Sequence, residues 1–189
     1  VQAGVTIEKI FALESYRDQL AAFPQTVWVS EEILRDLADT QTPQGIVAVI
    51  LKEEVGLPDF SRGKFLFLED VQDPGNVGTM IRTADAAGFT GVIVSDKSAD
   101  IYSLKTLRSM QGSHFHLPIY RMSVATFIEE VKKSNLPILA TTLSRDSKDY
   151  RELSPLENFA LVMGNEGQGI SPSMAESANQ LVHIGMKGK

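Results

Sequence analysis

The chain has 189 residues, which suits one domain of ordinary size or two small ones. Its 43% hydrophobic and 22% charged residues exclude a disordered chain, a collagen-like repeat and a membrane bundle. No segment approaches the roughly 18–20 apolar residues that span a bilayer. We therefore expect no membrane partner. Cys is absent and the three His are scattered, so we expect no disulfide and no metal site. We also expect a cytoplasmic location, for which the absence of Cys is weak evidence.

The net charge of −6 is concentrated at one end of the chain. Residues 1–60 hold ten acidic and four basic side chains, which accounts for −6, whereas residues 61–189 hold fourteen of each. An acidic protein is not typical of nucleic-acid binding. A local basic cluster can still act within a Debye length of roughly 8 Å. The basic residues that could form such a cluster are Arg62, Lys64, Arg82, Lys105, Arg108, Arg121 and Arg145.

The first 64 residues alternate strand and helix signals. Residues 7–13 and 26–29 read as strands, and Ser30 is a good N-cap for the helical spacing that follows. The apolar run 46–51 predicts a buried strand. Residues 52–64 are charged and contain Gly and Pro, so we expect a linker and a domain boundary there.

The second part repeats strand, loop and helix. The predicted strands are 65–68, 92–94, 115–119, 137–143, 159–163 and 181–184, and the predicted helices are 77–87, 100–110 and one that Ser123 caps. Alternation of this kind implies a mostly parallel sheet covered by helices. Ligands of such sheets lie beyond the carboxyl ends of the strands.

The first unusual strand end is residues 68–89, LEDVQDPGNVGTMIRTADAAGF. Residues 73–75 predict a turn, and Asn76 is placed to cap a helix that begins at Val77. On a helical wheel Arg82 lies about 140° from Val77, away from the apolar stripe. We therefore expect an exposed Arg82, which is either an ordinary solvated side chain or a ligand-binding one.

The second unusual strand end is residues 161–171, LVMGNEGQGIS. Glu166 lies in a turn whose backbone a ligand could approach closely because of Gly164, Gly167 and Gly169. The pattern fits neither the Rossmann fingerprint nor the Walker A sequence. A plain strand-to-helix turn and a ligand site both remain open, and Ser171 with Pro172 predicts the helix that follows.

The two chain ends are abrupt. The last strand runs into residues 183–189, HIGMKGK, with no helix after it. Residues 1–4 read like the end of a helix followed by a glycine stop. We therefore expect that pieces are missing at both ends.

These segments resemble the signature blocks of the SpoU (TrmH) family of RNA ribose 2′-O-methyltransferases, within the SPOUT superfamily. The resemblance covers residues 64–189. The family's first block is an Asn, a Gly and an Arg, which correspond here to Asn76, Gly78 and Arg82. Its second block is a Gly-x-Glu-Gly turn, which corresponds to residues 164–167.

The third block of the family departs from its pattern in this chain. It normally reads Ile-Pro-Met, then Gly, then Ser-Leu-Asn. Here Ile184 and Met186 are present, Gly185 replaces the Pro, and the sequence ends before a Ser-Leu-Asn segment. A role carried by that segment therefore has no counterpart among these residues.

The resemblance implies a domain organisation. Residues 58–189 would form a knotted SPOUT domain, with a mostly parallel sheet covered by helices and without its C-terminal helix. Residues 1–57 look like the small ribosomal-protein-like α/β domain that binds RNA, without its first helix. The resemblance further implies a homodimer that uses S-adenosyl-L-methionine to methylate RNA, preferably ribosomal RNA because such front domains are typical of the rRNA-directed members.

The site residues follow from the same resemblance. The catalytic residues would be Arg82, Asn76 and Glu166. The cofactor-binding residues would be Thr142, Gly164, Ile184 and Met186, and Gly164→Val would weaken cofactor binding with the fold retained. At the end of a helix, the residues offered to RNA phosphates would be Arg108, Ser109 and His114.

The identity of the base stays open. The family assigns it to Arg82, but a guanidinium pKa lies above about 12, so orientation of the hydroxyl and stabilisation of the developing alkoxide suit Arg82 better. Glu166 is either the competing base or a carboxylate that holds its turn. Asn76 orients Arg82 or the ribose, or is only a helix cap.

Three other functions remain as alternatives. The substrate could be tRNA, or the protein could bind RNA without catalysis. The glycines at 164–169 could instead serve a nucleotide or dinucleotide enzyme. Retention of all three catalytic candidates counts against a non-catalytic binder, and the missing Rossmann fingerprint counts against a dinucleotide enzyme.

Overall fold

The computed structural model describes residues 5–40, 42–52 and 55–185. The chain divides into two compact units, Val1–Glu54 and Val55–Lys189, where the sequence predicts a division after residue 57. The expected helix end at residues 1–4 lies outside the described residues. No helix in the described ranges is long and apolar enough to cross a membrane.

The first unit contains β1 (Ile7–Ala12), η1 (Glu14–Tyr16), β2 (Thr26–Trp28), α1 (Glu31–Ala38) and β3 (Ile46–Ile50). Its sheet has the order β2-β1-β3, with β1 parallel to β2 and antiparallel to β3. Ser30 caps α1 as predicted, because its side chain accepts a hydrogen bond from the Ile33 backbone N–H. The strand predicted at 46–51 is confirmed as β3, but its predicted burial is wrong: among the described residues β3 pairs with β1 alone, and Val49 is 41% exposed.

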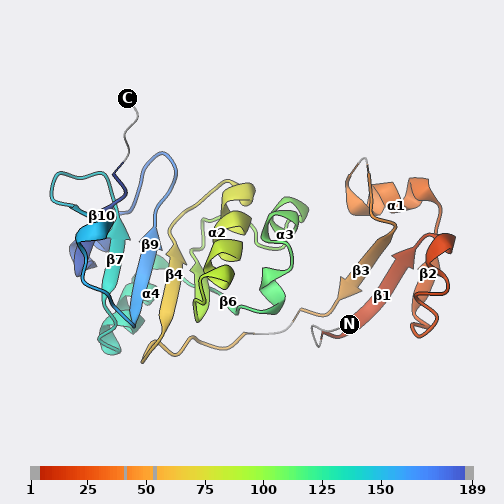
Figure 1. Cartoon of the computed structure of the whole chain (residues 1–189), viewed down its shortest axis with the longest axis horizontal. Coiled ribbons are helices and arrows are strands. Elements are labelled where there is room, and N and C mark those ends of the chain that lie inside the picture. The colour runs from red at the N-terminus through yellow and green to blue at the C-terminus, as the bar shows by residue number, and fades with distance from the viewer. Residues whose placement is uncertain (1–4, 41, 53–54, 186–189) are drawn as a thin grey trace. The chain divides into compact units, whose positions relative to one another are not determined.

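The second unit is built on one seven-stranded sheet. Figure 1 shows β4, β9, β7 and β10 of this sheet side by side. Its elements are β4 (Lys64–Leu68), α2 (Pro74–Ala86), β5 (Gly91–Val94), α3 (Leu104–Met110), η2 (Ser113–Phe115), β6 (Ile119–Arg121), α4 (Val124–Lys133), β7 (Ile138–Thr141), β8 (Lys148–Asp149), η3 (Tyr150–Glu152), β9 (Phe159–Met163), α5 (Pro172–Ser177) and β10 (Gln180–His183). The strand order is β6-β5-β4-β9-β7-β10-β8. Every described pairing in this sheet is parallel, which confirms the predicted mostly parallel sheet.

Two apolar cores cover the two faces of this sheet. Alternation along β4 sends Phe65 and Phe67 to one face and Leu66 and Leu68 to the other. Helices α4 and α5 pack on the first face, where the Phe67 and Phe127 rings stack with centroids 4.0 Å apart. Helices α2 and α3 pack on the second face, over β4 and β5.

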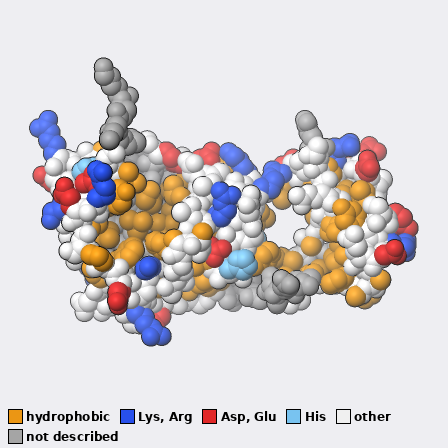
Figure 2. Space-filling model, in the orientation of Figure 1, with side chains coloured by type: hydrophobic (Ala, Val, Ile, Leu, Met, Phe, Trp, Pro, Cys, Tyr) orange, Lys and Arg blue, Asp and Glu red, His pale blue; other side chains and the backbone are white. Residues whose placement is uncertain are grey.

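Helices α2 and α3 cover only part of the second face of the sheet. On β9, Ala160 and Val162 of the first face are 0% exposed, whereas Leu161 and Met163 of the second face are only half-buried. Figure 2 shows hydrophobic side chains gathered at the surface over β7 and β9. The part of the sheet beyond α2 therefore presents apolar side chains to its surroundings.

Two local predictions are wrong, and one short strand was not predicted at all. The predicted strand at 115–119 is a 3-10 turn (η2) followed by β6, which starts at Ile119. The predicted helix at 100–110 begins only at Leu104, because the Ser103 side chain caps it by accepting from the Thr106 N–H. The short strand β8 had no signal, since two polar residues have no periodicity to read.

Candidate active site

Helix α2 begins at Pro74, three residues before the predicted start. Its N-cap is Asp73, whose Oδ1 accepts from the Asn76 N–H at 2.9 Å. The pKa of Asp73 is lowered, first by the hydrogen bond from Lys105 and then by the one from Asn76. The prediction of Asn76 as the cap is therefore wrong. Because Asp73 caps the helix, the amide group of Asn76 is free to bind elsewhere.

That amide binds Glu166, which lies in the loop after β9. Asn76 Nδ2 donates to Glu166 Oε1 at 3.0 Å. The backbone N–H of Asp73 also donates to Oε1, and the N–H of Gln72 donates to Oε2, both at 3.2 Å. Both carboxylate oxygens of Glu166 thus hold the loop that leads into α2. The two blocks noticed in the sequence meet at this carboxylate.

The ionisation of Glu166 follows from these contacts. Partial burial is the largest single influence and raises its pKa. The hydrogen bonds from Asn76, Gln72 and Asp73, with one from its own backbone, outweigh burial and leave the pKa below its ordinary value. A carboxylate in this state is ionised at neutral pH and already accepts hydrogen bonds from three donors. Two roles were left open for Glu166, the base and a carboxylate that holds its turn, and these contacts favour the second.

A second residue of the same loop, Asn165, ties it to the end of β4. Its Oδ1 accepts from the N–H groups of Gly167 and Gln168, and its Nδ2 donates to Asp70 O at 2.8 Å. The backbones of Asn165 and Gly169 also exchange two hydrogen bonds. The loop is therefore closed on itself and anchored, rather than loosely extended.

Gly164 is needed inside this closed loop. A Cβ at Gly164 would lie 2.3 Å from Gly169 C and 2.5 Å from Ile170 N, both backbone atoms. The expectation that Gly164→Val would spare the fold is therefore wrong, because the clash is with the loop itself. By contrast, a Cβ at Gly167 would meet only Asn165 Oδ1 at 3.7 Å, and one at Gly169 would meet nothing within 4 Å.

Asp70 supplies a sharp turn between β4 and this network. Its φ is +55°, a left-handed conformation that is uncommon outside glycine. The Asp70 N–H donates to Ser95 Oγ at 2.8 Å, and that hydroxyl donates to Asp70 Oδ1 at 2.7 Å. Asp70, Ser95 and Asn165 were not among the predicted site residues. Isolated Asp, Ser and Asn residues give no local signal of such long-range contacts.

Arg82 lies on the side of α2 that meets α3. Along this side of α2, Gly78, Arg82 and Asp85 follow one another at spacings of four and three residues, so they form one stripe on the helix. At Gly78 a Cβ would lie 2.5 Å from Ser109 Cβ and 2.6 Å from Thr106 O, so glycine allows α3 to pack directly on α2. One turn beyond Arg82, Asp85 Oδ2 lies 3.3 Å from His116 Nδ1.

Arg82 is exposed, as predicted, and no contact with the described residues restrains its guanidinium. Across the described ranges of the second unit it forms no hydrogen bond or ion pair. The stripe places it beside the segment that carries Ser109 and His114. The structure thus brings the expected catalytic Arg and the expected RNA-binding residues onto neighbouring elements.

Of those RNA-binding candidates, Arg108 is exposed and Ser109 is half-buried, with its hydroxyl donating to Lys105 O at 2.9 Å. His114 is half-buried against Phe115, and its Nδ1 is buried without a partner among the described residues. Desolvation first, and the neighbouring His116 second, lower the pKa of His114. It is therefore mainly neutral at pH 7.

Three of the four expected cofactor residues lie at the carboxyl ends of three neighbouring strands. Thr142 follows β7, Gly164 follows β9 and Ile184 follows β10, and β7 pairs with both of the others. The Thr142 N–H donates to Val182 O at 2.9 Å. Ile184 is 62% exposed and the neighbouring Leu143 is 83% exposed. The fourth candidate, Met186, lies outside the described residues.

The second unit is similar to a known protein family. Residues 63–189 match the SpoU rRNA methylase family. The chain belongs to this family. The match spans β4 to the end of the chain and so includes the segments that hold Asn76, Arg82 and Glu166.

Individual relatives extend the similarity beyond that region. The chain is 39% identical over 165 residues to the Bacillus subtilis 23S rRNA (guanosine(2553)-2′-O)-methyltransferase RlmP, covering 87% of this chain and 65% of that protein. An AdoMet-bound rRNA methyltransferase from Sinorhizobium meliloti has a TM-score of 0.87 at 30% identity, over 100% of this chain and 74% of the other. A TrmH/SpoU tRNA modifying enzyme from A. aeolicus has a TM-score of 0.59 at 31% identity, over 67% and 64%.

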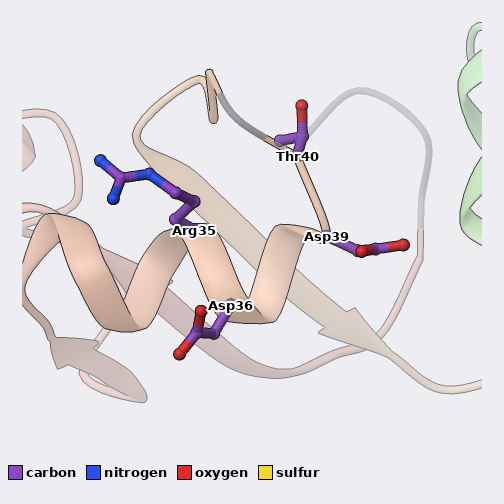
Figure 3. A pocket seen from close by; sticks show the side chains of 4 residues that line it. All are labelled: Arg35, Asp36, Asp39 and Thr40. Carbon is purple, nitrogen blue, oxygen red and sulfur yellow. The ribbon is translucent and has the colours of Figure 1, made fainter.

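A hollow in the first unit is separate from this chemistry. It has a volume of about 390 Å³ and is lined by Arg35, Asp36, Asp39 and Thr40. Figure 3 shows that these side chains point in different directions rather than toward a common space. It is an open surface hollow at the end of α1, and the site residues all belong to the second unit.

Proposed function

We propose that this protein transfers a methyl group from S-adenosyl-L-methionine to a ribose 2′-hydroxyl of ribosomal RNA. The observation that carries the proposal is the contact between Asn76 and Glu166, which joins the two family blocks at one edge of the sheet. The chain spans 65% of the length of RlmP, so the activity of the whole protein is inferred from this shared part.

The residues at the strand ends fit this cofactor. Leu143 and Ile184 offer exposed apolar side chains that a purine ring could cover. Gly167 and Gly169 leave backbone that a ligand can approach, because little or nothing occupies their Cβ positions. Thr142, Gly164 and Ile184 would hold the cofactor, together with Met186. When bound, it supplies a methyl group that is already activated by a positive sulfur.

The protein's own task is then to position the ribose hydroxyl and favour its deprotonated form. Arg82 is exposed and unrestrained, and its planar fork can bind a hydroxyl and a phosphate oxygen at once. Its positive charge stabilises the developing alkoxide. Glu166 and Asn76 hold the start of α2 and so set the position of the helix that carries Arg82. Arg108, Ser109 and His114 would contact RNA phosphates nearby.

The rRNA preference is supported by how much of the chain each relative matches. The rRNA methyltransferase from Sinorhizobium meliloti covers both units of this chain, whereas the tRNA modifying enzyme covers 67% of it. The first unit, an α/β domain, would be the RNA-binding module. An enzyme that modifies ribosomal RNA would work in the cytoplasm, and we include that location in the proposal.

A knotted chain path and a homodimer belong to the same proposal. Strand β10 lies between β7 and β8, so the chain that joins β7 to β8 must cross β10, which enters the sheet later in the sequence. This crossing supports a knot, against the general rule that chains do not thread loops. The exposed Leu143, Tyr150, Leu156 and Ile184 support a surface that a second copy covers.

The experiment that tests the proposal is methyl transfer from labelled cofactor to purified ribosomal RNA and to tRNA. Methylation of rRNA, mapped as a 2′-O-methyl nucleotide that disappears without the gene, is the expected result. Transfer to tRNA alone would replace the substrate. RNA binding without transfer would leave a non-catalytic binder, and thermal stabilisation by NAD or ATP instead of S-adenosylhomocysteine would favour a nucleotide enzyme.

The dimer has its own test. Light scattering at micromolar concentration should give twice the mass of one chain. A monomer that still methylates RNA would contradict this part of the proposal.

A further inference from the structure

Gly185, the last described residue, packs against an ion pair. A Cβ at Gly185 would lie 3.0 Å from Asp149 Oδ2 and 3.4 Å from Arg151 Nη2. The φ of Gly185 lies outside the left-handed region, so its backbone conformation does not require glycine. The ion pair, rather than the backbone, therefore limits the space at this position.

The Asp149 carboxylate is firmly held. Its Oδ1 accepts from the backbone N–H of Arg151 at 3.0 Å and from Arg151 Nε at 2.9 Å, and its Oδ2 accepts from Nη2 at 2.6 Å. Only 15% of the Asp149 side chain is exposed, against 67% of the Arg151 side chain. A carboxylate held by a two-pronged contact and a backbone donor cannot easily move away from Gly185.

The segment around this pair is attached to the end of β10 by further contacts. Strand β8 pairs with β10, which places Asp149 opposite His183. Ser147 Oγ lies 2.9 Å from His183 Nδ1. The segment 147–151 thus contacts residues 182–185 through backbone pairing, one side-chain hydrogen bond and the packing at Gly185.

We propose that Asp149 and Arg151 are a positioning pair that holds residues 184 and 185 in the conformation that binds S-adenosyl-L-methionine. The inference rests on the proposed function, in which Ile184 contacts the cofactor. Gly185 by itself does not restrict the backbone, in contrast to the Pro that the family pattern carries there. The side chains packed against Gly185 supply that restriction instead.

The first test measures the affinity for S-adenosylhomocysteine by calorimetry. Asp149→Ala should weaken binding by about threefold to fivefold, the scale of a partly exposed ion pair. Arg151→Ala should weaken it similarly. The matched control is Glu14→Ala, which removes the exposed Glu14–Arg17 pair of the first unit and should leave the affinity unchanged.

The second test exploits the space at Gly185. Gly185→Pro should weaken binding in the otherwise unaltered protein, because the ring would press on Asp149. In the Asp149→Ala background the same change should strengthen binding, since the space is then open and proline restores the restriction. A role limited to general stability would not produce this change of sign. Circular dichroism and thermal unfolding would confirm that the variants are folded.

The outcomes separate the two proposals. No binding by the unaltered protein would overturn the proposed function, and this inference with it. If the unaltered protein binds but Asp149→Ala and Arg151→Ala bind equally well, the inference alone is overturned. The same holds if Gly185→Pro has the same effect in both backgrounds. If Asp149→Ala does not fold, the affinity is compared between the unaltered protein, Arg151→Ala, and Gly185→Pro made in the Arg151→Ala protein.

Discussion

Asn76 Nδ2 donates a hydrogen bond to Glu166 Oε1 at 3.0 Å, although 90 residues separate the two in the sequence. The contact exists because β4 and β9 are neighbours in the sheet and both end at the same edge. It forms only because Asp73 takes over the capping of α2. The proposed active site therefore depends on how two strand-end loops are joined.

The first prediction is that Asn76 and Glu166 act as one unit. Asn76→Ala and Glu166→Gln should each lower the free energy of unfolding and the methyl-transfer rate. Together they should be less than additive, by about 1 kcal/mol in stability, because both remove the same charge-assisted hydrogen bond. Urea unfolding of the two single variants and the double variant measures this coupling. Full additivity would show that the bond contributes nothing.

The second prediction is that Arg82 acts in the chemical step. Arg82→Ala should lower the methyl-transfer rate by about 10²–10⁴-fold, because a charge-stabilising group is lost. Arg82→Lys should recover only part of the rate, since the charge returns without the planar fork. Affinity for S-adenosylhomocysteine should change by less than about threefold.

Single-turnover kinetics with saturating RNA and cofactor measure this step directly. If Arg82→Ala mainly loses cofactor binding, or transfers methyl at a near-normal rate, Glu166 becomes the leading candidate for the base despite its three hydrogen bonds.

The third prediction concerns the packing of α2 on α3. Gly78→Ala should lower the free energy of unfolding by about 1–3 kcal/mol, the usual range for overpacking, because the new Cβ would meet backbone atoms of α3. The matched control is Gly56→Ala, where nothing lies within 4 Å of the new Cβ and no loss is expected. Equal stability of the two variants in urea would contradict the close approach of the helices.

The fourth prediction is that alanine substitutions at two glycines of one loop, Gly164 and Gly167, differ in their effect on stability. Gly164→Ala should lower the melting temperature and weaken S-adenosylhomocysteine binding together, because its Cβ would collide with the backbone of Gly169 and Ile170. Gly167→Ala has room for its Cβ and should keep the melting temperature. Any loss of affinity in Gly167→Ala then reports on the ligand rather than on folding. Calorimetry alongside thermal unfolding distinguishes these cases.

The fifth prediction concerns pH. Burial first, and the neighbouring His116 second, lower the pKa of His114 in the folded state, so the unfolded chain binds more protons there once the pH falls toward the ordinary histidine value of about 6.5. The stability that a neutral His114 contributes is fully present above about pH 6.5 and decreases below it. His114→Gln should flatten this part of the curve of unfolding free energy against pH. An unchanged slope between about pH 6.5 and 5 would exclude His114 as its source.

Helix caps and short strands, which depend on residues close together in the chain, could be predicted from the amino-acid sequence alone. Ser30, Ser123 and Ser171 act as N-caps as predicted, because a cap needs only its own helix. The strand at 159–163 was predicted with its observed bounds, since a short apolar run between Asn158 and Gly164 needs no partner to be recognised. The resemblance to the family blocks likewise rests on residues that lie close together in the sequence.

The relationships between distant residues depend on the three-dimensional arrangement of the strands. The strand order places β9 beside β4 and inserts β10 between β7 and β8, and no local pattern specifies such pairings. The contacts of Glu166 with the β4–α2 loop, of Asn165 with Asp70, and of Gly185 with Asp149 all follow from that order. Helix and strand signals depend on neighbours in sequence, whereas this candidate site is assembled by the order of parallel strands, which only long-range burial and pairing determine.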